Sequence, residues 1–145
     1  GPGVGVIGMC FSGGFALAAA ADESVLAPVL SQPAMPPPIG AGKSATGLSV
    51  IEEAAVSRRA ADGLCALGLR FTQDRSVPPE RFAAFERLLG DGWRAFEIDS
   101  SPGNPDGIPA NAHSVLTDAS ADVPAHPTHR ANELLVDFLR ERLTG

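Results

Sequence analysis

The sequence predicts an α/β fold, in which a mostly parallel β-sheet carries helices on both faces. Two observations predict it: short apolar runs recur along the chain, and stretches with helical propensity or helical spacing separate them. Consecutive strands joined through helices run parallel within one sheet. The expected strands are Val4–Ile7, Val25–Leu30, Leu64–Phe71 and Trp93–Ile98, and the expected helices are Phe15–Ala21, Ser49–Ala61, Arg81–Leu89 and His129–Leu143.

The first three elements form a strand–helix–strand unit. Val4–Ile7 is a continuous apolar run flanked by glycines, as in the buried strands of parallel sheets. The alanine-rich stretch that follows has high helical propensity. Val25–Leu30 is a second apolar run, and Ser-Gln-Pro ends it.

Residues 33–61 form an irregular, lid-like insertion in this prediction. Prolines and glycines crowd Pro33–Lys43, which excludes regular helix and central strand there. A low-complexity linker is the alternative for this stretch. Ser49 and Glu52 have the spacing of a capping box, so a helix is expected to begin after Ser49.

The second half of the chain adds two strands and two helices. The double proline before Arg81 and the glycine after Leu89 are typical helix boundaries. Trp93–Ile98 alternates apolar and polar residues, which places this strand near a sheet edge. The loop 100–112 follows it, and apolar residues at helical spacing then predict the last helix.

Length and composition bound the classes of function. A chain of 145 residues suits a single domain, 1–145, and the opening GPGVGVIG predicts a fragment whose upstream strands are missing. A net charge of −6 and a single lysine argue against a nucleic-acid partner. The longest apolar runs are too short for a membrane span. Two cysteines are too few for a disulfide framework, which predicts a cytoplasmic protein.

The strongest local signal is Gly-Met-Cys-Phe-Ser-Gly-Gly, residues 8–14, between an expected strand and an expected helix. This is the pattern of a nucleophile elbow with Cys10 in the nucleophile position. Small residues at Gly8 and Ser12, followed by Gly13, suit a turn that strains the nucleophile's backbone. The following helix points its N-terminus at the sulfur and favours the thiolate, and the Phe11 N–H is a candidate oxyanion donor.

Each cysteine also has a structural interpretation. A buried cysteine that packs as a small apolar side chain is the alternative for Cys10. Glycines on both sides of a strand–turn–helix apex favour the catalytic interpretation there. Cys65 lies inside an expected apolar strand, so we expect a structural role for it.

An acid and a base follow at places that suit a catalytic triad. Asp74 comes directly after the third strand, at the sheet edge where α/β sites form, and Asp99 is the competing acid. His113 precedes the last helix and completes the chain order nucleophile, acid, base. His126 and His129 flank the start of that helix and are expected to be surface or capping residues, with a metal site as the weaker alternative.

A dinucleotide-binding fingerprint competes for the same residues. Gly3, Gly5 and Gly8 match GxGxxG, but they lie within the expected strand and not after it. Asp22 or Glu23 would have to bind the ribose, yet both precede the second strand. We therefore keep dinucleotide binding as a minor alternative.

The chain resembles the dienelactone hydrolase family of the α/β-hydrolase superfamily. The blocks that carry the resemblance extend over most of the chain: Val4–Gly14, Leu67–Asp74, Pro78–Phe82, Gly107–Pro109, Ala112–Ser114 and Phe138–Leu143. Where that family has Gly-His-Gly-Phe around its base, this chain has Ala-His-Ser-Val at residues 112–115, which indicates a divergent subgroup.

The resemblance implies hydrolysis of a small-molecule ester or lactone through an acyl-cysteine intermediate. Cys10 would be the nucleophile, His113 the base, and Asp74 the group that orients His113, with no metal or organic cofactor. It also implies that the second oxyanion donor lies upstream of Gly1, so this segment alone is expected to be weak or inactive. A hydrolase-like binding module without turnover is the alternative function.

Overall fold

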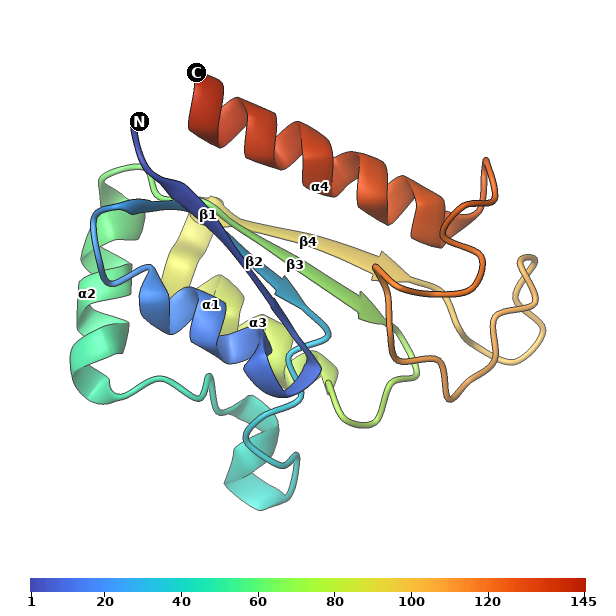
Figure 1. Ribbon diagram of the computed structural model, residues 1–145. Coiled ribbons are helices and arrows are strands. Elements are labelled where there is room, and N and C mark those ends of the chain that lie inside the picture. Colours follow the sequence, from blue (N-terminus) through green and yellow to red (C-terminus); the bar gives the residue numbers. More distant parts are fainter.

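The computed structural model describes all residues, 1–145, and confirms the α/β fold. The four strands are β1 (Val4–Met9), β2 (Val25–Ser31), β3 (Ala66–Phe71) and β4 (Trp93–Ile98). All neighbouring strands are parallel, and their order in the sheet is β1-β2-β3-β4. Their carboxyl ends therefore meet at one edge, where the long loops of the chain gather (Figure 1).

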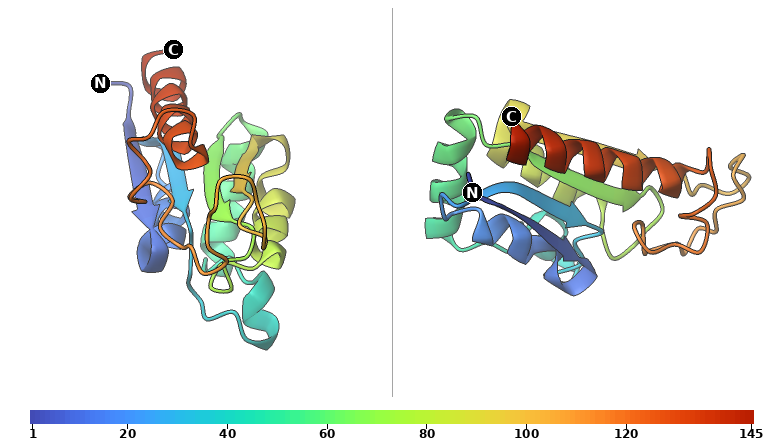
Figure 2. Two further views of the ribbon diagram at one scale, coloured as in Figure 1. Left: turned by 90° about the vertical axis from the view of Figure 1, so that its right-hand side faces the viewer. Right: turned by 45° about the horizontal axis from the view of Figure 1, so that its top comes forward.

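Helices cover both faces of the sheet, as predicted. On one face lie α1 (Gly13–Ala19), α2 (Val50–Ala61) and α3 (Pro79–Leu89), and on the other lies α4 (Pro127–Thr144) (Figures 1 and 2). Short 3-10 helices precede α1, interrupt the irregular segment and follow α3; they are η1 (Cys10–Ser12), η2 (Gly40–Ser44) and η3 (Gly90–Gly92).

Two apolar clusters separated by the sheet form the core. Leu17, Val56 and Phe85 bring α1, α2 and α3 together on one face, and Phe138 of α4 joins Leu69 and Phe71 on the other. The alternation of apolar residues in β2 and β3 supplies both clusters, so these two strands are the most deeply buried. The loops at the carboxyl edge thus follow strands that are packed on both faces.

The first strand differs from the prediction of a buried strand. Val4 and Ile7 are 50% and 45% exposed, because β1 is an outer strand that pairs only with β2. Only Gly8 of this strand is fully buried. The predicted edge character of β4 is confirmed, so the sheet has an edge at each end.

The segment between β2 and α2 is fixed to the body of the domain. The predicted capping box is confirmed, since the Glu52 N–H donates to Ser49 Oγ at 3.2 Å and the Ser49 N–H donates to Glu52 Oε2 at 2.7 Å. The part of the segment before Ser49 is held by Arg81 of α3, which is fully buried. Its guanidinium donates hydrogen bonds to the carbonyl oxygens of Pro33, Pro36, Gly42 and Ala45. The irregular segment is therefore held by one side chain of α3.

Candidate active site

Cys10 lies at the apex of a tight turn between β1 and α1. Its φ of 53° falls in the left-handed region, which a non-glycine residue adopts only where the surroundings enforce it. A Cβ added to Gly8 would stand 2.2 Å from the Ser12 carbonyl oxygen, so the two arms of the turn approach too closely for any side chain there. The geometry is that of the predicted elbow.

The second close approach falls at Gly13 and not at Ser12. A Cβ on Gly13 would lie 2.5 Å from Cα of Pro33, whereas the Ser12 side chain is exposed. Ser12 Oγ accepts a hydrogen bond from the Met9 N–H at 3.1 Å and donates to the Met9 carbonyl at 3.0 Å. Ser12 thus closes the turn through its hydroxyl. The sequence had suggested only that a small side chain is needed at this position, and this hydrogen bonding was not predicted.

The three predicted side chains form one continuous hydrogen-bonded chain. Nε2 of His113 lies 2.9 Å from Sγ of Cys10, and Nδ1 lies 2.5 Å from Oδ2 of Asp74. The side chain of His113 is 30% exposed and that of Asp74 is 5% exposed, so the carboxylate is shielded while the imidazole stays accessible. The structure brings together residues that the sequence separates by 103 positions.

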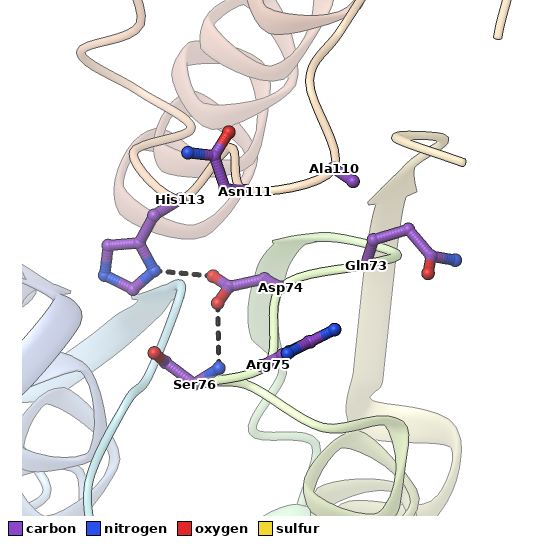
Figure 3. Close-up of a pocket in the computed structure, with 7 residues that line it drawn as sticks. All are labelled: Gln73, Asp74, Arg75, Ser76, Ala110, Asn111 and His113. Carbon is purple, nitrogen blue, oxygen red and sulfur yellow. Dashed lines mark hydrogen bonds and ion pairs between the residues drawn. The ribbon is translucent and has the colours of Figure 1, made fainter. Parts of the chain in front are cut away.

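Asp74 is held from both sides. Its Oδ1 accepts a hydrogen bond from the Ser76 N–H at 2.9 Å, which leaves Oδ2 for the imidazole (Figure 3). Backbone bonds from the Asp74 N–H to Phe71 and from the Val77 N–H to Asp74 fold the loop after β3 into a compact turn. The carboxylate therefore presents one fixed oxygen to His113.

The loop that carries His113 is organised by polar side chains. The amide of Asn104 bonds the backbone of Ser101 and of Ile108, and the Ala112 N–H donates to the Pro109 carbonyl at 2.9 Å. The buried Gln32 reaches the same loop from the end of β2. Sequence analysis assigned no role to Asn104 or Gln32; the available signal for Gln32 was a polar residue directly after a buried strand.

The competing acid and bases lie outside this chain of contacts. Asp99 is exposed, and its Oδ1 accepts from the Ser101 N–H at 2.9 Å. Hydrogen bonding by the side chain and then the backbone of Ser101 lowers the pKa of Asp99 below the ordinary value. His126 caps α4, accepting from the Thr128 N–H at 3.3 Å. His129 lies 2.8 Å from the Ala121 carbonyl oxygen. The capping prediction for His126 is confirmed, and no group of three or more metal-ligating side chains is present.

Cys65 lies just before β3 and not inside a strand, contrary to the prediction, because the pairing with β4 begins at Ala66. It is half-buried, and its sulfur lies 3.8 Å from Nη2 of Arg94. Cys65 has no histidine beside it, so it offers a natural comparison for Cys10 in the same molecule.

Two hollows are lined by residues of the Cys10–His113–Asp74 contact chain, and a third is lined by Phe11, the neighbour of Cys10. One, of about 350 Å³, is lined mainly by polar residues that include Asp74, Arg75, Asn111 and His113. Figure 3 shows the Asp74 carboxylate pointing to His113, with the side chains of Gln73 and Arg75 turned away from the imidazole. The second, of about 420 Å³, is lined by Asp74 together with Lys43 and Glu80 among others. The third, of about 200 Å³, is lined by Phe11, Gly14, Phe15, Met35, Pro36 and Gly47.

The glycines of the GxGxxG pattern serve packing. A Cβ on Gly3 would lie 2.5 Å from the Ser24 carbonyl oxygen, and one on Gly5 would lie 2.7 Å from Leu139 of α4. Gly5 and Gly8 lie within β1, as expected, and the Asp22 carboxylate bonds to Ser24. Close approach of the start of β2 and of α4 thus accounts for Gly3 and Gly5, and close approach of Ser12 within the turn accounts for Gly8.

Comparison with known proteins adds no assignment. No protein-family model, no curated protein and no solved structure matches this chain. The structure contains no helix with the length and apolar character needed to cross a membrane.

Proposed function

We propose that this chain is a thiol hydrolase that cleaves a carboxylic ester or lactone through an acyl-cysteine intermediate. The observation that carries the proposal is the contact chain Cys10–His113–Asp74, with 2.9 Å and 2.5 Å between its polar atoms. The resemblance to dienelactone hydrolases supports the same reaction from the sequence. We place the reaction in the cytoplasm, where both cysteines would stay free thiols.

Acylation begins with the transfer of the Cys10 proton to Nε2 of His113. The thiolate then attacks the carbonyl carbon of the substrate and forms the S–C bond, and the carbonyl oxygen becomes an oxyanion. When the tetrahedral intermediate collapses, the C–O bond to the alcohol breaks and Nε2–H of His113 donates its proton to the departing oxygen. For a lactone, that alcohol stays attached to the acyl chain.

Deacylation reverses these roles with water. His113 accepts a proton from a water molecule, which attacks the thioester carbon, and the sulfur departs and is reprotonated. Asp74 keeps the proton of the neutral imidazole on Nδ1, so that Nε2 faces the sulfur as an acceptor. The products are the carboxylic acid and the free thiol.

Charge on the oxyanion requires backbone donors. Phe11 lies in the first turn of η1, where N–H groups lack intrahelical acceptors, and it directly follows the nucleophile. Loss of one oxyanion donor lowers kcat by about 10²–10³-fold in other hydrolases. The Phe11 N–H is therefore the donor that we assign to the oxyanion, and its loss should slow both acylation and deacylation.

A ligand-binding module without turnover is the second candidate. It is favoured by the hollows at the site, because Asp74, His113 and Phe11 line them but Cys10 does not. Hydrolysis of p-nitrophenyl acetate separates the two functions. We expect weak turnover that disappears in Cys10→Ala and survives in Cys65→Ala, the matched control; equal rates in both variants would refute the hydrolase.

A further inference from the structure

The residues at the carboxyl end of β2 contact both the nucleophile turn and the loop of the base. The Ala34 N–H donates to the Cys10 carbonyl at 2.9 Å, and Pro33 fills the space beside Gly13. Directly before them, Gln32 turns its side chain toward the loop that carries His113. The stretch 31–34 therefore spans the two halves of the candidate site, although β2 supplies no member of the triad.

Gln32 is buried, and both its backbone and its side chain are hydrogen-bonded. It is 2% exposed, its φ is 34°, and its N–H donates to the Leu69 carbonyl of β3 at 2.7 Å. The amide oxygen accepts a hydrogen bond from the hydroxyl of Ser31, which is fully buried. A left-handed backbone at a buried glutamine indicates that its side chain must reach a defined partner.

That partner is the base loop. Gln32 Oε1 also accepts from the Val115 N–H at 3.2 Å, a bond between residues 83 positions apart. Val115 is fully buried and lies two residues after His113. Without the glutamine oxygen, the Val115 N–H would be left unpaired in an apolar cluster, a state that folded proteins avoid.

We propose that Gln32 is a positioning residue, which fixes the loop at Val115 so that Nε2 of His113 stays within hydrogen-bonding distance of the Cys10 sulfur. Its significance for catalysis rests on the proposed function. The same segment holds Cys10 through Ala34, so one rigid element sets the separation of nucleophile and base. Misplacement of a reacting group by about 1 Å lowers rates by up to about 10²-fold in other enzymes.

The test is the rate of Cys10 alkylation by iodoacetamide between pH 5.5 and 9.5, with the Cys65 rate as internal reference. We expect Gln32→Met to slow Cys10 alkylation near pH 6.5 by about 10-fold and to shift its pH profile toward that of His113→Ala. The downfield imidazole N–H resonance from the His113–Asp74 bond should broaden or vanish in the same variant. Val56→Ala, which removes buried volume on the opposite face of the sheet, is the matched control and should keep both signals.

The outcomes separate Gln32 from the proposed function. If wild-type Cys10 reacts no faster than Cys65, the hydrolase proposal fails. If Cys10 is fast in wild type and equally fast, with an unchanged resonance, in folded Gln32→Met, only the positioning role is overturned. Should Gln32→Met not fold, Gln32→Asn repeats the test, because asparagine tolerates positive φ and its shorter amide cannot reach Val115.

Discussion

At the scale of single residues, the backbone of Cys10 carries the clearest mark of function. Its φ of 53° costs an L-residue about 1–2 kcal/mol relative to an ordinary conformation. Neighbouring residues hold the backbone in this conformation: Gly8 permits the close turn and Ser12 closes it with two hydrogen bonds. A strained residue whose sulfur meets an imidazole indicates that the strain serves to present the thiol.

Because Cys10 has a positive φ, glycine should be more stabilising than alanine at this position, the reverse of their usual order. Glycine relieves positive φ, so we expect Cys10→Gly to be more stable than Cys10→Ala by about 1 kcal/mol. At ordinary positions glycine is the less stable of the two by about 0.5–1 kcal/mol. Urea unfolding of both variants measures the difference, and a more stable alanine variant would show that the turn is unstrained.

The choice of acid is testable with a matched pair. Asp74→Asn removes the carboxylate that fixes the His113 tautomer, and we expect ester hydrolysis to fall by about 10²–10⁴-fold. Asp99→Asn changes an exposed carboxylate that bonds Ser101 and Thr72 and not His113, and it should leave the rate unchanged. Rates measured at saturating p-nitrophenyl acetate decide between them; a loss confined to Asp99→Asn would move the acid to β4.

At the scale of elements, Arg81 joins α3 to the irregular segment after β2. Burial lowers the pKa of its guanidinium below the ordinary value, yet the group has no carboxylate partner. Its donors bond backbone carbonyl oxygens instead, at Ala45, Pro33 and Gly42 among others. One cation thus takes the place of the regular hydrogen bonds that a proline-rich segment cannot make.

Loss of this side chain should therefore be costly. We expect Arg81→Met, similar in length but without donors, to lower the free energy of unfolding by about 2–4 kcal/mol, because several carbonyl groups lose their donors together. Arg58→Met on the exposed face of α2 is the control and should cost less than about 0.5 kcal/mol. Equal effects of the two substitutions would contradict the role of Arg81.

The contact of β4 with α4 predicts a dependence on pH. Arg94 donates two hydrogen bonds of 2.7 Å to Glu141, and these lower the pKa of Glu141 below its ordinary value of 4.5. A lowered folded-state pKa gives stability that is present above about pH 4.5 and is lost as the pH falls through the folded-state pKa. Both side chains are about half exposed, so the contribution is about 0.5 kcal/mol.

Glu141→Gln checks this dependence. The variant should be less stable than wild type by about 0.5 kcal/mol at pH 7, and the difference should shrink toward pH 3. Glu86→Gln changes an exposed glutamate of α3 that forms no ion pair and serves as the control. Unfolding free energies measured by urea at both pH values report the effect; a difference independent of pH would exclude the ion pair as its source.

At the scale of the whole molecule, local sequence patterns predicted the helices and strands. Strand exposure and the contacts of Gln32 and Arg81 depend on residues far apart in the sequence and were not predicted. Apolar runs and caps located all four strands and all four helices, because periodicity and capping are local properties of the chain. Exposure of β1 was missed, since it depends on which strand lies beside which. The elbow pattern and the chain order predicted three residues, Cys10, Asp74 and His113, whose side chains the structure places in contact. Gln32 and Arg81 act across 83 and 48 residues and leave no local pattern.

Trapping of the acyl-enzyme tests the central claim most directly. After brief exposure to p-nitrophenyl acetate at neutral pH, peptide mass spectrometry should find one acetyl group on Cys10, little on Cys65, and far less on Cys10 in His113→Ala. Brief exposure favours detection of this species, because the acyl-enzyme forms before water hydrolyses it. Equal acetylation of Cys10 and Cys65, unaffected by His113→Ala, would contradict an activated nucleophile and with it the hydrolase.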